Sequence, residues 1–348
     1  MATYIHRNMA ADTLRVLAIV AVISIHTAPY LPESAELGRN LDMPTFVNML
    51  ARFAVPLFFI FSGYFWAAKV ETTGNVLIPS VEMLKRISYL FIFWSLIYLL
   101  PTNILEAIDY GWTGPLKRFY WNIQRVMTHP MDLLFQGTKI HLWFLAGLLW
   151  SVAISWIFVS QNKKISLILL ALLLYIVGLA GKAYSTSPLG FQVDFDFRNG
   201  PFFSLIFFVT GYFLYENKKT LIYTRVGVII ALFGVIMHFL ELIAINKIWG
   251  INMAQDYVIG TYFYGLGVAI IGLSNAQILQ INRASSIAPA VLGIYASHYI
   301  FVDLLRPANR YFAGSQIWTL VYICIVFFLS YKLSITMSKY SLSKKLVS

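Results

Sequence analysis

Apolar residues follow one another in long runs from one end of the chain to the other, separated by short polar segments. A helix needs roughly 20 mostly apolar residues to cross the hydrocarbon core of a bilayer, which is about 30 Å thick. Ten runs approach this length. The fifth and sixth are short, and one re-entrant unit made of these two is the alternative. The pattern predicts an all-α, polytopic membrane protein with about ten transmembrane helices, at residues 12–30, 46–67, 87–105, 141–159, 165–181, 201–215, 224–245, 257–276, 287–305 and 316–337.

Two connections between these runs differ from simple turns. The segment 106–140 carries Trp112 and Trp121 among basic residues, which is typical of an amphipathic helix lying at the membrane interface. A lid over an outward-facing site is the second interpretation, because long loops are often functional. The stretch 194–198 predicts another ordered connection. Neither segment forms a separate folding unit, so residues 1–348 are treated as one transmembrane domain.

Composition and charge support this interpretation. Of the 348 residues, 59% are hydrophobic and 12% are charged, about half the charged share of a soluble chain. The net charge of +11 comes from basic residues in the short segments between apolar runs, where Lys and Arg set membrane topology. Their distribution predicts that both termini are cytoplasmic and that the protein is a multi-pass protein of a bacterial inner membrane. We expect contact with membrane lipid and no nucleic-acid partner.

The first run contains ionisable residues, which are costly inside a membrane and mark functional positions. Asp12, Arg15 and His26 fall on one side of a helix, because eleven residues from Arg15 to His26 bring it to within about 20° of a whole number of turns. The axial rise between Arg15 and His26 is about 16 Å. This arrangement suits a long, thin ligand with an anionic end at Arg15 and its reactive end at His26. The alternatives are a snorkelling Asp12–Arg15 pair and a buried histidine satisfied by neighbouring backbone.

Further polar residues lie in the halves of other runs that face the predicted outer side. Arg52 and His141 each lie near the start of a run, and Tyr295 and His298 share a helix face three residues apart. The pair His238 and Glu241 favours a structural contact between helices. No His-Glu-x-x-His motif or cysteine pair is present, so we expect no metal site.

Five motifs, in order along the chain, resemble those of the acyltransferase-3 family of integral membrane acyltransferases. They are Asp12-x-x-Arg15-x10-His26, the segment 55–64 (Val-Pro-Leu-Phe-Phe-Ile-Phe-Ser-Gly-Tyr), Lys85-Arg86, the segment 141–145 (His-Leu-Trp-Phe-Leu) and the segment 292–298 (Leu-Gly-Ile-Tyr-Ala-Ser-His). The resemblance covers nearly the whole chain. It is strongest to the stand-alone bacterial O-acetyltransferases of exopolysaccharide and enterobacterial common antigen.

The resemblance implies an enzyme that takes acetyl-CoA from the cytoplasm and acetylates a hydroxyl of a polysaccharide or lipid-linked oligosaccharide facing the periplasm. His26 is then the general base, or less favourably the carrier of the acetyl group, since the pKa of a histidine lies near ambient pH. Asp12 supports this centre through Arg15, because a straight helix puts it about 21 Å from His26. The donor contacts expected are Arg15, Lys85, Arg86, Ser62 and Tyr64, and the acceptor contacts expected are His141, Trp143, Tyr295, His298 and Arg52.

Two other functions fit about ten spans with buried charges. A transporter or flippase for lipid-linked sugars often shows internal repeats. Here the repeat is a short echo between the segments 58–65 and 207–213, which packing alone explains. A non-enzymatic scaffold for polysaccharide assembly proteins is the other alternative. Binding of acetyl-CoA separates the enzyme from the transporter, and tolerance to loss of Asp12, Arg15 and His26 identifies the scaffold.

Overall fold

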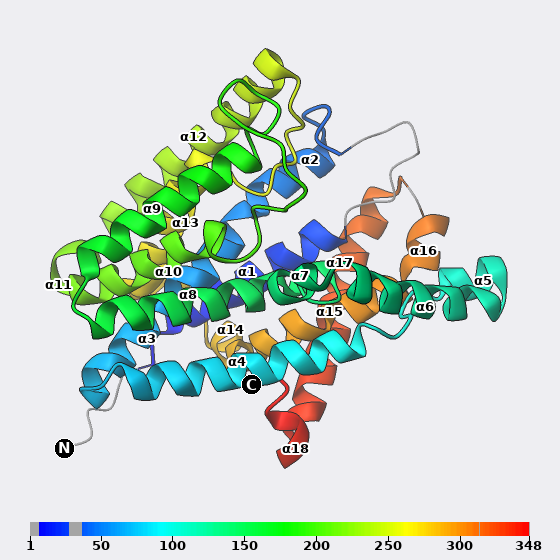
Figure 1. Cartoon of the computed structure of the whole chain (residues 1–348), viewed down its shortest axis with the longest axis horizontal. Helices are drawn as coiled ribbons and strands as arrows, with labels where there is room; N and C mark the ends of the chain where they lie inside the picture. The colour runs from blue at the N-terminus through cyan, green and yellow to red at the C-terminus, as the bar shows by residue number, and fades with distance from the viewer. Residues whose placement is uncertain (1–6, 28–36, 313, 348) are drawn as a thin grey trace.

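The computed structural model describes residues 7–27, 37–312 and 314–347, and within these ranges the chain forms helices and no strand. The longer helices build the body of the molecule (Figure 1). They are α1 (Met9–His26), α3 (Ala54–Thr73), α4 (Leu77–Ile97), α8 (Trp143–Ser160), α9 (Lys164–Gly181), α10 (Pro201–Glu216), α12 (Thr224–Trp249), α13 (Ile259–Leu273), α15 (Val291–Leu304) and α17 (Gln316–Ser338).

Shorter helices connect or extend these elements. α2 (Met43–Leu50) leads into α3 through a 3-10 turn (Ala51–Phe53), and α14 (Asn282–Ile287) leads into α15 through another (Ala288–Ala290). The remaining short helices lie in connections: α5 (Leu105–Tyr110), α6 (Thr113–Thr128), α7 (Pro130–Phe135), α11 (Lys218–Leu221), α16 (Arg306–Tyr311) and α18 (Ser341–Lys344).

The predicted all-α polytopic membrane fold is confirmed. Seven helical segments of the described ranges are long and apolar enough to cross a membrane, and α10 and α13 are shorter apolar helices. The number of crossings and the side of the termini stay predictions. The seven segments are Met9–His26, Met43–Thr73, Ile140–Ser160, Lys164–Gly181, Thr224–Trp249, Asn282–Leu304 and Ile317–Ser338.

Two boundaries differ clearly from the prediction. The third helix was expected at 87–105, but α4 begins at Leu77 and ends at Ile97, because Glu82, Lys85 and Arg86 interrupt the apolar pattern without interrupting the helix. The first helix begins at Met9 rather than at residue 12, and residues 28–30 of that expected span lie outside the described ranges.

Helices at the periphery expose an apolar stripe of side chains on one face and bury a second stripe on the other. On α12 the exposed side chains include Ile229, Phe233, Ile236 and Leu240, which recur at the helical spacing of three or four residues. α17 instead buries Tyr322, Val326, Ser330 and Ser334 against α15, at intervals of four. The outward stripes form the apolar surface expected to contact membrane lipid.

α3 and α10 lie against each other through a reciprocal pair of glycines. An ideal Cβ on Gly63 would lie 1.9 Å from the carbonyl oxygen of Phe208, and one on Gly211 would lie 1.9 Å from that of Ile60. Only glycine permits this approach of two backbones. The two glycines occupy equivalent places in the similar segments 58–65 and 207–213. The similarity therefore reflects a helix crossing, which agrees with the prediction that packing alone explains it.

α12 and α13 also pack closely, and the pair His238 and Glu241 lies in their contact. Glu241 accepts hydrogen bonds from the backbone N–H groups of Ile259 (2.9 Å) and Gly260 (2.8 Å) at the start of α13. Nδ1 of His238 lies 3.0 Å from Oγ1 of Thr261. The carboxylate satisfies N–H groups that a helix start leaves unpaired. The predicted structural contact between helices is confirmed.

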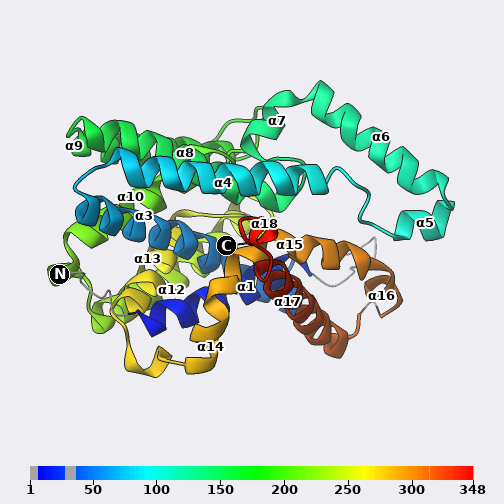
Figure 2. The same ribbon diagram turned by 90° about the horizontal axis from the view of Figure 1, so that it is seen from below.

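The connection between α4 and α8 extends beyond the bundle. In Figure 2, α5 and α6 project to the same end of the molecule as α16. α6 carries basic residues beside exposed aromatic side chains, and Trp112 just before it is 88% exposed. The helix predicted in this segment is confirmed. Its position places it over the end of the bundle at which α4 ends and α8 begins.

Candidate active site

α1 is unbroken from Met9 to His26, so the helical spacing of its charged residues holds in the structure. The carboxylate of Asp12 accepts from Arg7 Nε at 2.6 Å and from the Ser285 hydroxyl at 2.9 Å, and lies 3.5 Å from the guanidinium of Arg15. Asp12 therefore ties α1 to α14 and holds Arg15 in place. Over the fourteen residues to His26 the helix rises about 21 Å, which rules out direct contact between Asp12 and that ring.

A cavity of about 370 Å³ begins beside Arg15 and runs between α3, α4 and α8. We call it the inner cavity. Arg15, Lys69 and Arg86 lie at one end together with the carboxylate of Glu82, which leaves an excess of positive charge there, and Phe144 and Tyr295 lie at the other end. Between them the wall is largely apolar and aromatic. Its lining includes Phe58, Phe61, Ser62, Phe65, Trp66, Met83, Ile87, Leu145, Leu148 and Leu292.

Three histidines from three separate helical segments meet at the far end of α1. The ring of His298 on α15 lies 5.4 Å from that of His26 and 5.0 Å from that of His141, between ring centroids. We call these three residues the histidine cluster. Tyr299 packs against all three, at 5.1 Å from His26, at 5.7 Å from His298 and stacked at 4.9 Å on His141. The structure thus brings together residues that are 115 and 157 positions apart (141 − 26 and 298 − 141).

Backbone carbonyls fix the tautomers of two rings in the cluster. Nδ1 of His298 lies 2.6 Å from the carbonyl oxygen of Tyr295, and Nε2 of His141 lies 3.3 Å from that of Ala296. A carbonyl only accepts, so these nitrogens donate and the other nitrogen of each neutral ring carries a lone pair. Nε2 of His298 and Nδ1 of His141 are buried and have no hydrogen-bond partner in the described part of the chain. The cluster therefore holds two buried basic nitrogens.

A second cavity, of about 230 Å³, lies on the other side of His141, beneath α6. We call it the outer cavity. The wall between the two cavities is thin, because the His141 ring contacts Tyr295 of the inner cavity at 5.6 Å and Tyr98 of the outer cavity at 4.9 Å. The charged and aromatic residues lining the outer cavity are Tyr98, Arg118, Trp121, Arg125, Lys139, Asp303 and Arg306.

Sequence reasoning missed the residues that join the outer cavity to the histidine cluster. The ammonium of Lys139 lies 4.8 Å from the centre of the Tyr299 ring and 2.5 Å from the carboxylate of Asp303. Asp303 is fully buried and also pairs with Arg306 at 3.1 Å. A weak signal existed, because Asp303 is an acidic residue within a predicted span and such residues are rare there.

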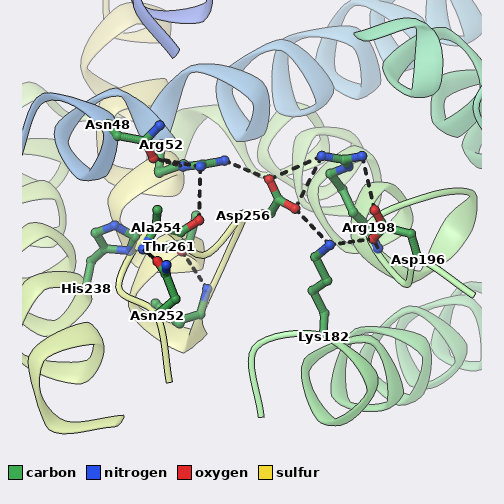
Figure 3. Close-up of polar contacts among 11 residues, drawn as sticks. Asn48, Arg52, Lys182, Asp196, Arg198, His238, Asn252, Ala254, Asp256 and Thr261 are labelled. Carbon is green, nitrogen blue, oxygen red and sulfur yellow. Dashed lines mark hydrogen bonds and ion pairs between the residues drawn. The ribbon is translucent and has the colours of Figure 1, made fainter. Parts of the chain in front are cut away.

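Figure 3 shows a compact network of charges centred on the carboxylate of Asp256. Asp256 accepts from Arg52 at 2.9 Å and Arg198 at 3.3 Å, and pairs with Lys182 at 3.2 Å. Burial alone would raise the pKa of Asp256. The three cations lower the pKa by more than burial raises it, so it lies well below the ordinary value and the carboxylate stays ionised. Arg198 comes from the predicted ordered connection 194–198, while Asp256 and Lys182 were missed.

The remaining predicted residues fall into two groups. Ser62, Arg15 and Arg86 line the inner cavity. Lys85 and Tyr64 do not line it: Lys85 is exposed on α4, and the ring of Tyr64 packs on that of Tyr215 at 5.1 Å. Trp143 and Arg52 were expected beside the acceptor. Both lie at the charge network, where the Arg198 guanidinium sits 5.2 Å from the Trp143 ring, and their role toward an acceptor stays a prediction.

No group of three or more His, Cys, Asp or Glu side chains within the described ranges is arranged to hold a metal ion. The groups that the site presents are imidazole, guanidinium and phenol side chains, from His26, Arg15 and Tyr295 among others. Together, a helical membrane bundle, a long cavity with a basic end and a buried imidazole cluster define an integral membrane enzyme of the group-transfer type.

Comparison with known families agrees with this class. The acyltransferase domain model matches residues 9–337, which includes all five motifs. The chain belongs to the acyltransferase-3 family.

Relatives with assigned names match over part of their length. Two proteins named amino-acid racemase from Enterococcus faecalis are 29% and 25% identical over 60% and 64% of this chain, covering 28% and 31% of their own length. A serine/alanine racemase from Enterococcus gallinarum is 25% identical over 67% of this chain and 33% of its own length. The chain thus spans about a third of the length of these relatives. No solved structure matches.

Proposed function

We propose that this protein is a membrane O-acetyltransferase that moves an acetyl group from cytoplasmic acetyl-CoA to a hydroxyl of a periplasm-facing or lipid-linked polysaccharide. The observation that carries the proposal is the inner cavity, which connects a basic end at Arg15 and Arg86 to Tyr295 beside the histidine cluster. A pantetheine arm is long and thin, with phosphates at one end and a thioester at the other. The cavity has the matching order of groups.

Donor binding follows from the charges and shape of that cavity. The guanidinium groups of Arg15 and Arg86 hold the phosphates, since a planar guanidinium matches phosphate oxygens in two parallel hydrogen bonds. The apolar wall, with Ser62 on α3, accepts the arm. The thioester then lies near Tyr295 and Phe144, one ring contact from His141.

His26 acts as the general base in this mechanism. Its ring nitrogen takes the proton of the acceptor hydroxyl as the oxygen attacks the thioester carbonyl. The carbon–sulfur bond breaks, the CoA thiolate leaves, and it takes up the proton that His26 removed, which returns His26 to its neutral form. His141 and His298 complete the buried pocket in which His26 works. The acceptor enters from the outer side, which the predicted topology assigns to the periplasm of a bacterial inner membrane.

The test uses the purified chain in lipid nanodiscs with acetyl-labelled CoA and surface glycans of the host. His26→Ala should lower transfer by about 10²- to 10⁴-fold, the range of general-base catalysis, while CoA binding is unchanged. His129→Ala is the matched control, because His129 is exposed on the turn between α6 and α7. Normal transfer by His26→Ala together with loss in His298→Ala would assign the base to His298 instead.

The racemase activity named for the relatives is not part of the proposal, because the matched segment covers about a third of those proteins. If acetyl-CoA fails to bind the wild-type protein, the acyltransferase proposal is overturned and transport of a lipid-linked sugar becomes the better account. Comparing surface-glycan composition with and without the protein then identifies the acceptor among exopolysaccharides and related polymers.

A further inference from the structure

We infer that the outer cavity binds the acceptor through a negatively charged group on its sugar, a carboxylate or a phosphate. This inference rests on the proposed function and specifies its substrate class. Four cations line the cavity, from Arg118, Arg125, Lys139 and Arg306, against one carboxylate, that of Asp303.

The balance remains positive when the carboxylates outside the lining are included. Glu106 pairs with Arg118 at 2.5 Å, and Asp132 lies 3.6 Å from Arg125. With Asp303 these make three acids against four bases. Asp303 is shared by Lys139 and Arg306, so neither cation has a carboxylate of its own at this point. One positive charge beside an open space favours an anion that fills the space.

The polar and aromatic groups of the same cavity suit a sugar ring. Trp121 lines it, with the Arg118 guanidinium 5.2 Å from the indole ring. Asn103 and Asn122 also line it. Its volume lies below the range of about 300–1,000 Å³ for drug-sized ligands, so it fits one sugar residue of a longer acceptor.

The location connects charge recognition to the reaction. Lys139 lies 4.8 Å from the centre of the Tyr299 ring, and that ring also packs on His26 and His141. An anion held at Lys139 and Arg306 would leave the rest of the sugar near Tyr98, whose ring packs on His141. A hydroxyl of the same residue is then directed to the histidine cluster. The cations thereby select the acceptor and set its register.

Binding of small probes tests the charge preference without requiring turnover. Glucuronate, glucose 6-phosphate and neutral glucose are titrated into the full chain in nanodiscs by calorimetry. We expect both anions to bind at least about tenfold more tightly than glucose, as one charge-assisted contact provides. The preference should weaken at high salt. If glucuronate binds more tightly than glucose 6-phosphate, the acceptor group is assigned as a carboxylate. If glucose 6-phosphate binds more tightly, the group is assigned as a phosphate.

Charge variants locate the effect. Arg125→Gln and Arg306→Gln should each reduce the anion preference about tenfold, and Arg125→Lys should retain part of it. Arg310→Gln is the matched control, because Arg310 lies on α16 near Arg306 but pairs with Asp109 outside the lining. Its preference should equal that of the wild type. Equal binding of glucose and the anions, or an equal loss in the control, overturns the inference.

The two proposals fail in different ways. If the acyltransferase proposal is wrong, anions still bind selectively at the outer cavity but no label passes from acetyl-CoA to any glycan. If the present inference is wrong, label is transferred, yet neutral and anionic acceptors react equally and the cavity variants behave like Arg310→Gln. Thermal unfolding of each variant confirms that the fold is intact before binding is compared.

Discussion

The inner and outer cavities each reach a tyrosine that packs on His141, Tyr295 in the inner cavity and Tyr98 in the outer one, but their walls differ in polarity. The inner one is larger, about 370 Å³ against 230 Å³, and its wall is apolar except at the end that holds Arg15 and Arg86. The outer one carries charge throughout, from Arg118 to Arg306. A chain that binds two ligands can distinguish them by such a contrast. In the proposed mechanism, the donor is recognised at its phosphate end, and the acceptor is recognised next to the reacting group.

Among variants of the two cavities, the largest expected effect comes from removing the charge at the inner end. Arg15→Gln should weaken CoA binding by about 10- to 100-fold, because a hydrogen bond to a charged group contributes about 1.5–3 kcal/mol. Asp12 keeps Arg7 and Ser285 as partners, so the variant should fold. Equilibrium binding of CoA and of pantetheine, which lacks the nucleotide phosphates, measures the change.

In Arg15→Gln, CoA should no longer bind more tightly than pantetheine, whereas the affinity for pantetheine and the KM for the acceptor should be unchanged. Arg225→Gln is the control, since Arg225 is an exposed cation at the start of α12 that does not line the inner cavity. A parallel rise in the acceptor KM would show that the two cavities are not independent.

Filling the middle of the inner cavity should have an intermediate effect. Ser62→Phe places a ring among Phe58, Phe61 and Phe65, where overpacking costs about 1–3 kcal/mol and the pantetheine arm loses space. The KM for acetyl-CoA should rise roughly tenfold. Steady-state kinetics with a fixed acceptor measures it. Ser62→Ala, which loses the intrahelical hydrogen bond to Phe58 but adds no volume, should remain close to the wild type.

The smallest effect is expected at the wall between the cavities. Tyr98→Phe removes a hydrogen bond of 2.7 Å from the hydroxyl to the carbonyl of Ala296. That carbonyl keeps His141 at 3.3 Å, so the loss should be about 1 kcal/mol of folding free energy. Thermal unfolding measures it, and both KM values should stay within about twofold of the wild type. A large change in either KM would mean that the hydroxyl contacts a ligand.

The sequence alone predicted the helices and the stripe on α1, because apolar runs and helical spacing are local properties. It also predicted that Arg15, His26, His141 and His298 belong to the site, through motif resemblance. Pairings between distant segments were out of reach. Lys139 meets Asp303 across 164 positions, and Arg198 meets Asp256 across 58. Such contacts depend on how helices are arranged, which no single stretch of sequence specifies.

The early start of α4 shows a second reason for failure. The expected boundary followed hydropathy, while the helix follows backbone hydrogen bonding and continues through charged residues such as Glu82 and Arg86. Those residues face the inner cavity rather than lipid. A charged turn in this helix therefore marked the wall of a cavity, although the hydropathy pattern had indicated a connection between helices.

The crossing of α3 and α10 has a consequence for the width of the inner cavity. α3 presents Phe61, Ser62 and Phe65 to that cavity and turns Gly63 toward α10. A methyl group at Gly63 or Gly211 would force the two helices apart and push α3 into the inner cavity. The absence of a side chain at both glycines thus sets how close α3 lies to α10, and with it the width of the inner cavity.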